Sequence, residues 1–301
     1  MAFASCLIGL LRGAGFDGVE LSFPDLLASA NRYSALYEVE NVVGEMCTGY
    51  GLKIMSSSRS PTLKPGPEEA HCEKNACSRA RGWIKIMSAV GTDMLQVGSS
   101  DSRGRSQNID QLAAEVSELA DKLASHGFRL AYENWCWATH APGLRDVGAS
   151  VEKAGRPNIG LYLDMFRTVM GVLKCKAYEG SLEELVQTVL AEKVFFLQIR
   201  DAYRLDPPLN NMSEHESGLQ PRGEWSHEHR SLPYDGGYLP IQGVVRAVLQ
   251  TGFREWLSVE VFDGNKYGDD LRQFVEQGMS TCKQLVSEAS ASREVVIALD
   301  F

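Results

Sequence analysis

The chain has 301 residues, of which 44% are hydrophobic and 23% charged, and its formal net charge is −9 at pH 7. This length suits one large α/β barrel or two smaller domains, and the negative charge argues against nucleic acid or an anionic membrane surface as the main partner. The seven cysteines form no CxxC pair and indicate reduced thiols, and no apolar run reaches the roughly 20 residues of a membrane span. We expect a cytoplasmic protein that acts on a small molecule, and a homo-oligomer is left open.

Short apolar runs alternate with longer helical patterns along almost the whole chain, which is typical of a parallel sheet built from βα units. The predicted strands are 18–22, 52–57, 94–98, 129–134, 159–164, 194–199 and 256–261. The predicted helices are 5–13, 25–50, 68–90, 108–126, 143–154, 181–191, 240–251 and 267–290. Several strands are apolar on both faces, as a strand between a barrel core and outer helices requires. We therefore expect an α/β protein, a (β/α)8 TIM barrel that forms a single domain over residues 1–301.

The count of strands is seven instead of eight, because the sequence begins in a helix and the usual first strand is lacking. The segment 295–300 reads as a strand, and a further parallel strand after the last helix would fall beside strand 256–261. We hypothesise that this segment closes the barrel, because an open barrel leaves two sheet edges unpaired. The alternative is a tail that is disordered or packs on the surface.

One connection, from about residue 202 to 239, is unusually long and has little regular pattern. Loops of this length in a compact domain tend to be functional or disordered. Trp225 and Tyr234 within it favour an ordered lid over the strand ends.

Four polar side chains stand at the C-terminal ends of predicted strands: Glu133, Asp164, Gln198 and Glu260. In a barrel these ends converge on one rim, and three carboxylates that crowd there favour a bound cation. With the amide oxygen of Gln198, all ligands are oxygen atoms, which favours Mg2+ or Mn2+, with Co2+ or Zn2+ as alternatives. The alternative for one or two of these acids is a rim cap or an ion pair with arginine.

The sequence around these residues resembles the xylose isomerase-like sugar phosphate isomerase/epimerase superfamily of TIM barrels, from about Ala14 to Lys283. The matching blocks are AYENWCWATH, RPNIGLYLDMF, VFFLQIRDAYRL, W-S-x-x-x-R from Trp225 to Arg230, GGYLP and GFREWLSVEVF. They look most like the 3-dehydroshikimate dehydratase-like branch, which is common in fungi. The resemblance implies that the four rim residues are metal ligands, with glutamine in the third position as is typical of that branch.

One departure from the branch lies three residues after Asp164. Dehydratases that resemble this chain can carry a histidine there, but this chain carries Arg167. Arginine stays protonated, so it is a poor general base and a good anion clamp. Arg200 is likewise a cation where a small polar residue is commoner. The residues expected to hold a carboxylate or phosphate of an anionic substrate are Arg167, Arg200, Arg204, Trp225 and Arg230. The alternative for each arginine is an ion pair with Asp201, Asp206 or Glu228.

A cation at this rim would stabilise the enolate that forms when a proton leaves the carbon next to a carbonyl. The base that takes this proton is expected to be Glu133, Glu260 or His140, and the alternative for His140 is a structural hydrogen bond. The triplet 227–229 (His-Glu-His) looks like a metal motif, but adjacent side chains on an extended loop point apart.

Three functions remain open at the level of the sequence. The leading hypothesis is a metal-dependent lyase of the dehydratase type that acts on a hydroxy-keto or polyol-like molecule. The second is a sugar isomerase or epimerase, whose product would retain its water. The third is a barrel that no longer catalyses and has a binding role.

Overall fold

The structure is a computed structural model, and it describes residues 2–22, 26, 36–58, 72–99, 108–172, 182–183, 185–187, 189–204, 221–263 and 270–291. The chain divides into two compact units. Unit 1 comprises Met1–Ser100, Ser106–Glu133 and Ala149–Gly160, and unit 2 comprises Asp101–Arg105, Asn134–Gly148 and Leu161–Phe301. Each unit is described by itself.

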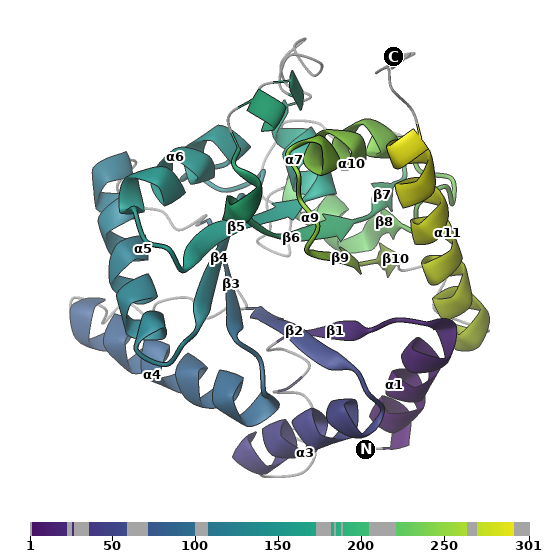
Figure 1. Ribbon diagram of the computed structural model, residues 1–301, viewed down its shortest axis with the longest axis horizontal. Coiled ribbons are helices and arrows are strands. Elements are labelled where there is room, and N and C mark those ends of the chain that lie inside the picture. Colours follow the sequence, from purple (N-terminus) through teal and green to yellow (C-terminus); the bar gives the residue numbers. More distant parts are fainter. Residues whose placement is uncertain are drawn as a thin grey trace. The chain divides into compact units, whose positions relative to one another are not determined.

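Unit 1 is a run of alternating helices and strands. In chain order these are α1 (Ala2–Ala14), β1 (Gly18–Ser22), α3 (Leu36–Gly49), β2 (Lys53–Ser58), α4 (Cys72–Val90), β3 (Met94–Gly98), α5 (Ile109–Ala124) and β4 (Arg129–Glu133). The strands pair in parallel in the order β1-β2-β3-β4. Helices α3, α4 and α5 pack against the strands and lie on one side of them (Figure 1). Among the described residues, no strand precedes α1.

Helices α4 and α5 are each followed, within three residues, by a glycine at which the chain turns toward the next strand. Gly91 and Gly127 have φ values of 77° and 73°, a left-handed conformation that glycine adopts without a steric penalty. The amide of Gly127 donates to Ala124 O at 3.0 Å, and that of Phe128 donates to Leu123 O at 3.0 Å. These bonds end α5 and start β4 within five residues.

Unit 2 contains the other parallel strands. β5 (Ile159–Asp164, in unit 2 from Leu161), β6 (Val194–Ile199) and β9 (Trp256–Val259) pair in the order β5-β6-β9. All six side chains of β5 and of β6 are buried, as expected of strands covered on both faces. The helices are α7 (Met165–Val172), the 3-10 turn η1 (Ala191–Lys193), α10 (Ile241–Gln250) and α11 (Leu271–Ala291), and α6 (Leu144–Ala154) is shared with unit 1. α10 and α11 lie side by side (Figure 1).

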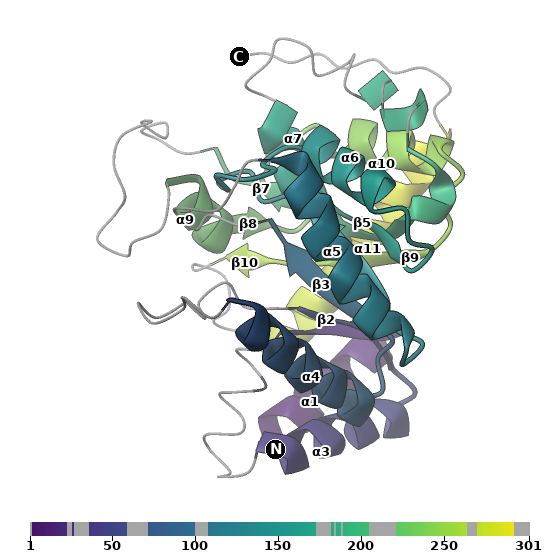
Figure 2. The same cartoon turned by 90° about the vertical axis from the view of Figure 1, so that its left-hand side faces the viewer.

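A second, small sheet extends unit 2 beyond the ends of β6 and β9. β7 (Asp201–Ala202), β8 (His229–Ser231) and β10 (Phe262–Asp263) form it in the antiparallel order β10-β8-β7. Helix α9 (Pro221–Glu228) runs directly into β8 and packs beside it (Figure 2). The expectation of an irregular connection over 202–239 is therefore wrong for 221–231. Proline opens α9 at its first position, where its missing N–H costs nothing, and the helix has no apolar stripe that a sequence pattern could reveal.

The seven predicted strands are all present, and four of them have the predicted bounds. β2 is shifted by one residue, β4 ends one residue earlier at Glu133, and β9 ends two residues earlier at Val259. Helix α7, which follows β5 without a loop, was not predicted. The segment 295–300 lies outside the described residues, so closure of the barrel stays a prediction, as does the single domain. None of the helices in the described ranges combines the length and apolar content needed to cross a membrane.

Candidate active site

Three of the four predicted rim residues come together in unit 2 because their strands pair in register. Asp164, the last residue of β5, pairs with Gln198 of β6, and Gln198 pairs with Ser258 of β9. Glu260 follows β9 directly. The ends of three adjacent parallel strands thus present two carboxylates and one amide at the same edge, as the sequence predicts.

The guanidinium of Arg200 lies among these three side chains. Successive residues of an extended chain point to opposite faces, so Arg200, two residues after Gln198, points to the same side. Arg200 Nε donates to Asp164 Oδ1 at 2.7 Å, and Nη2 donates to Gln198 Oε1 at 2.8 Å. Nη1 donates to Glu260 Oε2, and Nη2 also forms an ion pair with Asp164 Oδ2. One planar group therefore bonds all three side chains.

Asp164 also caps the N-terminus of helix α7. Its Oδ1 accepts the backbone N–H of Arg167 at 3.4 Å, three residues on, which is the geometry of a helix N-cap. The side chain of Arg167 returns to the same carboxylate, with Nε 2.8 Å from Oδ2. Asp164 is fully buried, so two guanidinium groups balance a charge that water cannot reach.

Glu260 is bound in the same way from the small sheet. Arg230 of β8 pairs with Phe262 of β10, and its Nη1 donates to the same Glu260 oxygen that Arg200 contacts. Ser226, four residues earlier, accepts from Arg230 Nε at 3.1 Å and fixes the guanidinium. We call Arg167, Arg200 and Arg230, with Asp164 and Glu260, the arginine cluster. Three guanidinium groups face two carboxylates, so one positive charge remains.

Aromatic rings form the walls of the arginine cluster. The guanidinium carbon of Arg167 lies 5.5 Å and 5.0 Å from the ring centroids of Trp135 and Trp137. That of Arg230 lies 4.8 Å from the centroid of Phe262. Cations over ring faces gain from the ring quadrupole, most where water is excluded. The two tryptophans, two apart in AYENWCW, were not predicted; they lie in a turn in which the amide of Ala138 donates to Trp135 O at 2.8 Å, so their spacing alone was no signal for a shared face.

The other two residues expected to contact substrate are Trp225, which is buried, and Arg204, which is exposed. Trp225 is 3% exposed, its indole N–H donates to Tyr203 O at 3.0 Å, and its ring meets Phe166 edge-on at 4.9 Å. Burial raises the pKa of the Tyr238 hydroxyl, and the positive charge of Arg204 acts to lower it. The substrate-binding roles of Trp225 and Arg204 both stay predictions.

From the sequence, His227 was considered only as part of the 227–229 triplet and was given no role, but α9 brings its ring beside two aromatic residues of the site. Its ring centroid lies 6.2 Å from that of Trp137 and 5.9 Å from that of Phe262. Partial burial of this ring, and then the positive charge of Arg167, lower the pKa of His227, while the charge of Glu260 acts in the opposite direction. The ring keeps part of its surface in solvent, so a neutral imidazole can meet a solute here.

His140 and Glu133 are the two remaining residues expected to take part in catalysis. His140 is buried, and its Nδ1 lies 2.7 Å from Thr139 Oγ1; its role as a base stays a prediction. Glu133 ends β4 in unit 1, where its Oε2 accepts from Gln96 Nε2 of β3 at 2.5 Å. The structure describes the two units separately, so the place of Glu133 relative to the other three rim residues stays a prediction.

Asp164, Gln198 and Glu260 offer the oxygen donors that Mg2+ or Mn2+ prefers, but Arg200 already bonds all three. Asp164 Oδ1, Gln198 Oε1 and Glu260 Oε2 each accept a hydrogen bond from Arg200. Among the described residues, no three His, Cys, Asp or Glu side chains gather in a group that could hold a metal ion. In this arrangement these residues do not fit a divalent ion.

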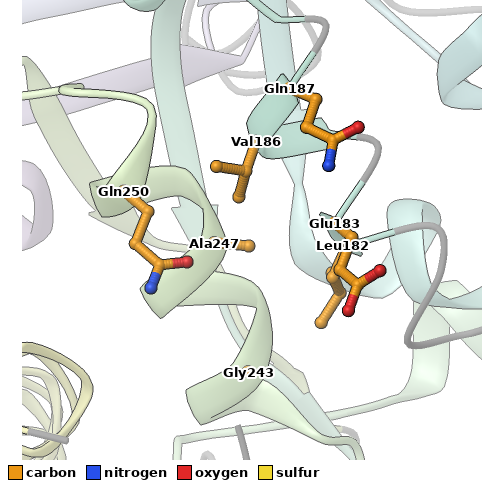
Figure 3. Close-up of a pocket in the computed structure, with 7 residues that line it drawn as sticks. All are labelled: Leu182, Glu183, Val186, Gln187, Gly243, Ala247 and Gln250. Carbon is orange, nitrogen blue, oxygen red and sulfur yellow. The ribbon is translucent and has the colours of Figure 1, made fainter. Parts of the chain in front are cut away.

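A hollow in the surface of unit 2 lies between residues 182–187 and α10 (Figure 3). It is lined by Leu182, Glu183, Val186, Gln187, Gly243, Ala247 and Gln250. Its polar groups are one carboxylate and two amides, and none of these is a cation that could hold an anionic substrate. The chemistry of unit 2 therefore lies with the arginine cluster.

Comparison with known proteins agrees with this fold. The sequence matches the family described as Xylose isomerase-like TIM barrel over residues 8–284, which confirms the expected α/β barrel. Among solved structures, a xylose isomerase-like TIM barrel/4-hydroxyphenylpyruvate dioxygenase fusion protein has a TM-score of 0.74 at 25% identity, over 93% of this chain and 40% of that one. The IOLI protein, solved with a bound zinc atom, has a TM-score of 0.72 at 18% identity, over 95% of this chain and 94% of its own.

Curated relatives carry one name. A 3-dehydroshikimate dehydratase of Neurospora crassa is 26% identical over 312 residues, which cover 92% of this chain and 84% of the relative. A 3-dehydroshikimate dehydratase of Pseudomonas aeruginosa is 28% identical over 84% of this chain, and the match spans 35% of that relative's length.

Proposed function

The chain is an enzyme that belongs to the xylose isomerase-like TIM barrel family, and we propose that it is a lyase of the dehydratase type. Its substrate is a small, anionic hydroxy-keto or polyol-like molecule. The relatives named as 3-dehydroshikimate dehydratases support the reaction type. The observation that carries the proposal is the arginine cluster, which leaves one positive charge at the strand ends of a chain with a net charge of −9.

The cluster suits an anionic substrate for an electrostatic reason. A surface of overall negative charge repels anions, and a local excess of positive charge with aromatic walls concentrates them at one place. Arg167 is the arginine we assign to this contact, because it lies over Trp135 and Trp137 and keeps 9% of its side chain exposed, whereas Arg200 has 0% and Arg230 has 1%.

Dehydration of a β-hydroxy ketone needs a base for the proton next to the carbonyl, and we assign this base to His227. The C–H bond breaks, the proton passes to the imidazole, and the electrons enter the enolate. The C–O bond to the β-hydroxyl then breaks, the imidazole returns the proton, and water leaves. The positive charge of the arginine cluster favours the enolate over the neutral ketone. Glu260 is less suited, because its Oε2 already accepts from Arg200 and Arg230.

A divalent ion held by Glu133, Asp164, Gln198 and Glu260, with Mg2+ or Mn2+ favoured, is the rival arrangement. It would supply a Lewis acid for the same enolate, but it requires that Arg200 give up its three partners. No step above depends on it.

The test is incubation with 3-dehydroshikimate, once in chelator and once with added Mn2+, while the aromatic absorbance of protocatechuate is followed. We expect product formation in both conditions, and an Arg167→Gln variant should need far more substrate. A product isomeric with the substrate would favour an isomerase or epimerase instead. Absence of any reaction with this and related hydroxy-keto acids contradicts the lyase assignment.

A further inference from the structure

The three side chains of unit 2 that could hold a metal ion are already bonded by one cation of the chain itself. We propose that the guanidinium of Arg200 is the resident cation of this centre, so that the protein holds Asp164, Gln198 and Glu260 together without a divalent ion. The geometry rests on the hydrogen bonds of 2.7 Å to Asp164 and 2.8 Å to Gln198, with the further bond to Glu260. It does not depend on the reaction that the enzyme catalyses.

The charge of Arg200 is permanent. A guanidinium group is a fixed cation in proteins. Its side chain and that of Asp164 both have 0% exposure, and a buried cation is stable only with its counter-charges. Asp164 and Glu260 supply these charges.

A metal ion would add charge that the centre cannot balance. Arg167 and Arg230 already form ion pairs with the same two carboxylates. Two further positive charges beside three guanidinium groups would face strong repulsion at contact distance. A divalent ion can therefore bind only if the side chain of Arg200 moves away from these oxygens. The buried positive charge of Arg200 would then need other partners. This links metal affinity to one side chain.

The position of Arg200 in the sequence explains why its side chain reaches the centre. β6 ends at Ile199, paired with Val259, and Arg200 is the next residue, as Glu260 is the next after β9. A small residue at position 200 would leave the space between the three oxygen donors open. Truncation of Arg200 should thus restore an oxygen-lined site for a hard cation.

The experiment is a titration with MnCl2, without substrate, of protein treated with chelator and then dialysed. Three variants accompany the wild type: Arg200→Ala, which removes the cation; Arg200→Lys, which keeps a positive charge; and Arg272→Ala, a charge-matched control on the exposed face of α11. We expect Arg200→Ala to gain one Mn2+ site, about 100-fold tighter than in the wild type, with Arg200→Lys and Arg272→Ala like the wild type. A thermal melt should show stabilisation by Mn2+ in Arg200→Ala alone.

Equal Mn2+ affinity in the wild type and Arg200→Ala overturns the proposal, whether both bind tightly or both bind weakly. If Arg200→Ala does not fold, the wild-type titration decides alone: a single Mn2+ site tighter than about 10 μM overturns it, and no such site supports it. Because substrate is absent, these outcomes are separate from the test of the lyase.

Discussion

Arg200 and a divalent ion would satisfy the same oxygens by different means. A metal ion coordinates them around a point, whereas a guanidinium donates from a planar fork and is weakly hydrated, which suits burial. At Asp164, Gln198 and Glu260 the fork reaches all three partners. At the scale of single residues, the identity of position 200 therefore decides which cation the site takes.

His227 gives a prediction on pH. Its pKa is lowered, first by burial and next by Arg167, so the neutral base persists to lower pH than for an ordinary histidine. In the pH profile of kcat/KM, we expect the pKa of the acid limb to lie below the ordinary histidine value of about 6.5. His227→Gln should lower kcat by about 100-fold or more and abolish this limb. An unchanged pH profile in His227→Gln would show that another group is the base.

Arg167 gives a prediction on substrate affinity. Arg167→Gln removes the cation over Trp135 and Trp137 and should raise KM for an anionic substrate by about 10-fold or more, with a smaller change in kcat. The control is Arg272→Gln on α11, which removes the same charge at an exposed position. An equal rise of KM in both variants would mean that the effect is long-range charge and that Arg167 does not contact the substrate.

The elements differ in how far the sequence could foresee them. Strand ends such as Asp164 and Glu260 were predictable, because an apolar run that stops on an acid marks a rim position. Helix α9 was not, because it has no apolar stripe, and the site of His227 depends on that helix. The orientation of the Arg200 side chain could not be predicted either. A long side chain can point to solvent, and its partners here come together only when the strands fold.

Asp201 shows how β7 is held to the turn before α10. Its Oδ1 accepts the amides of Ala202 at 2.8 Å and Leu239 at 2.9 Å. A Cβ on Gly237 would lie 2.1 Å from its Cγ, so only glycine fits there. Burial raises the pKa of Asp201 to about 6, although hydrogen bonds from the amides of Leu239 and Ala202 act to lower it.

This pKa predicts a stability change with pH. Because the folded pKa lies above the unfolded value of about 3.9, the folded state binds the proton more tightly. The contribution is fully present below pH of about 4 and is lost as the pH rises through about 6, a fall of about 3 kcal/mol at most. Asp201→Asn should flatten the free energy of unfolding over this window, measured by urea denaturation at several pH values. A wild-type stability that rises from pH of about 4 to 6 with the same slope in Asp201→Asn would contradict this assignment.

On the scale of the whole molecule, a negatively charged barrel carries a buried, net positive group at the ends of its strands. The family provides the scaffold, and its active sites lie at that edge. Arg167 and Arg200 place fixed positive charge at this edge. The sequence predicted Asp164, Gln198 and Glu260 as metal ligands, and the structure places the guanidinium of Arg200 among them.

The most direct measurement is a crystal structure of the wild-type protein grown in excess MnCl2, with anomalous diffraction data collected above the manganese edge. We predict no manganese peak between Asp164, Gln198 and Glu260, and electron density for the Arg200 guanidinium in that place. A manganese peak bonded to these three side chains, with Arg200 turned away, would contradict the account.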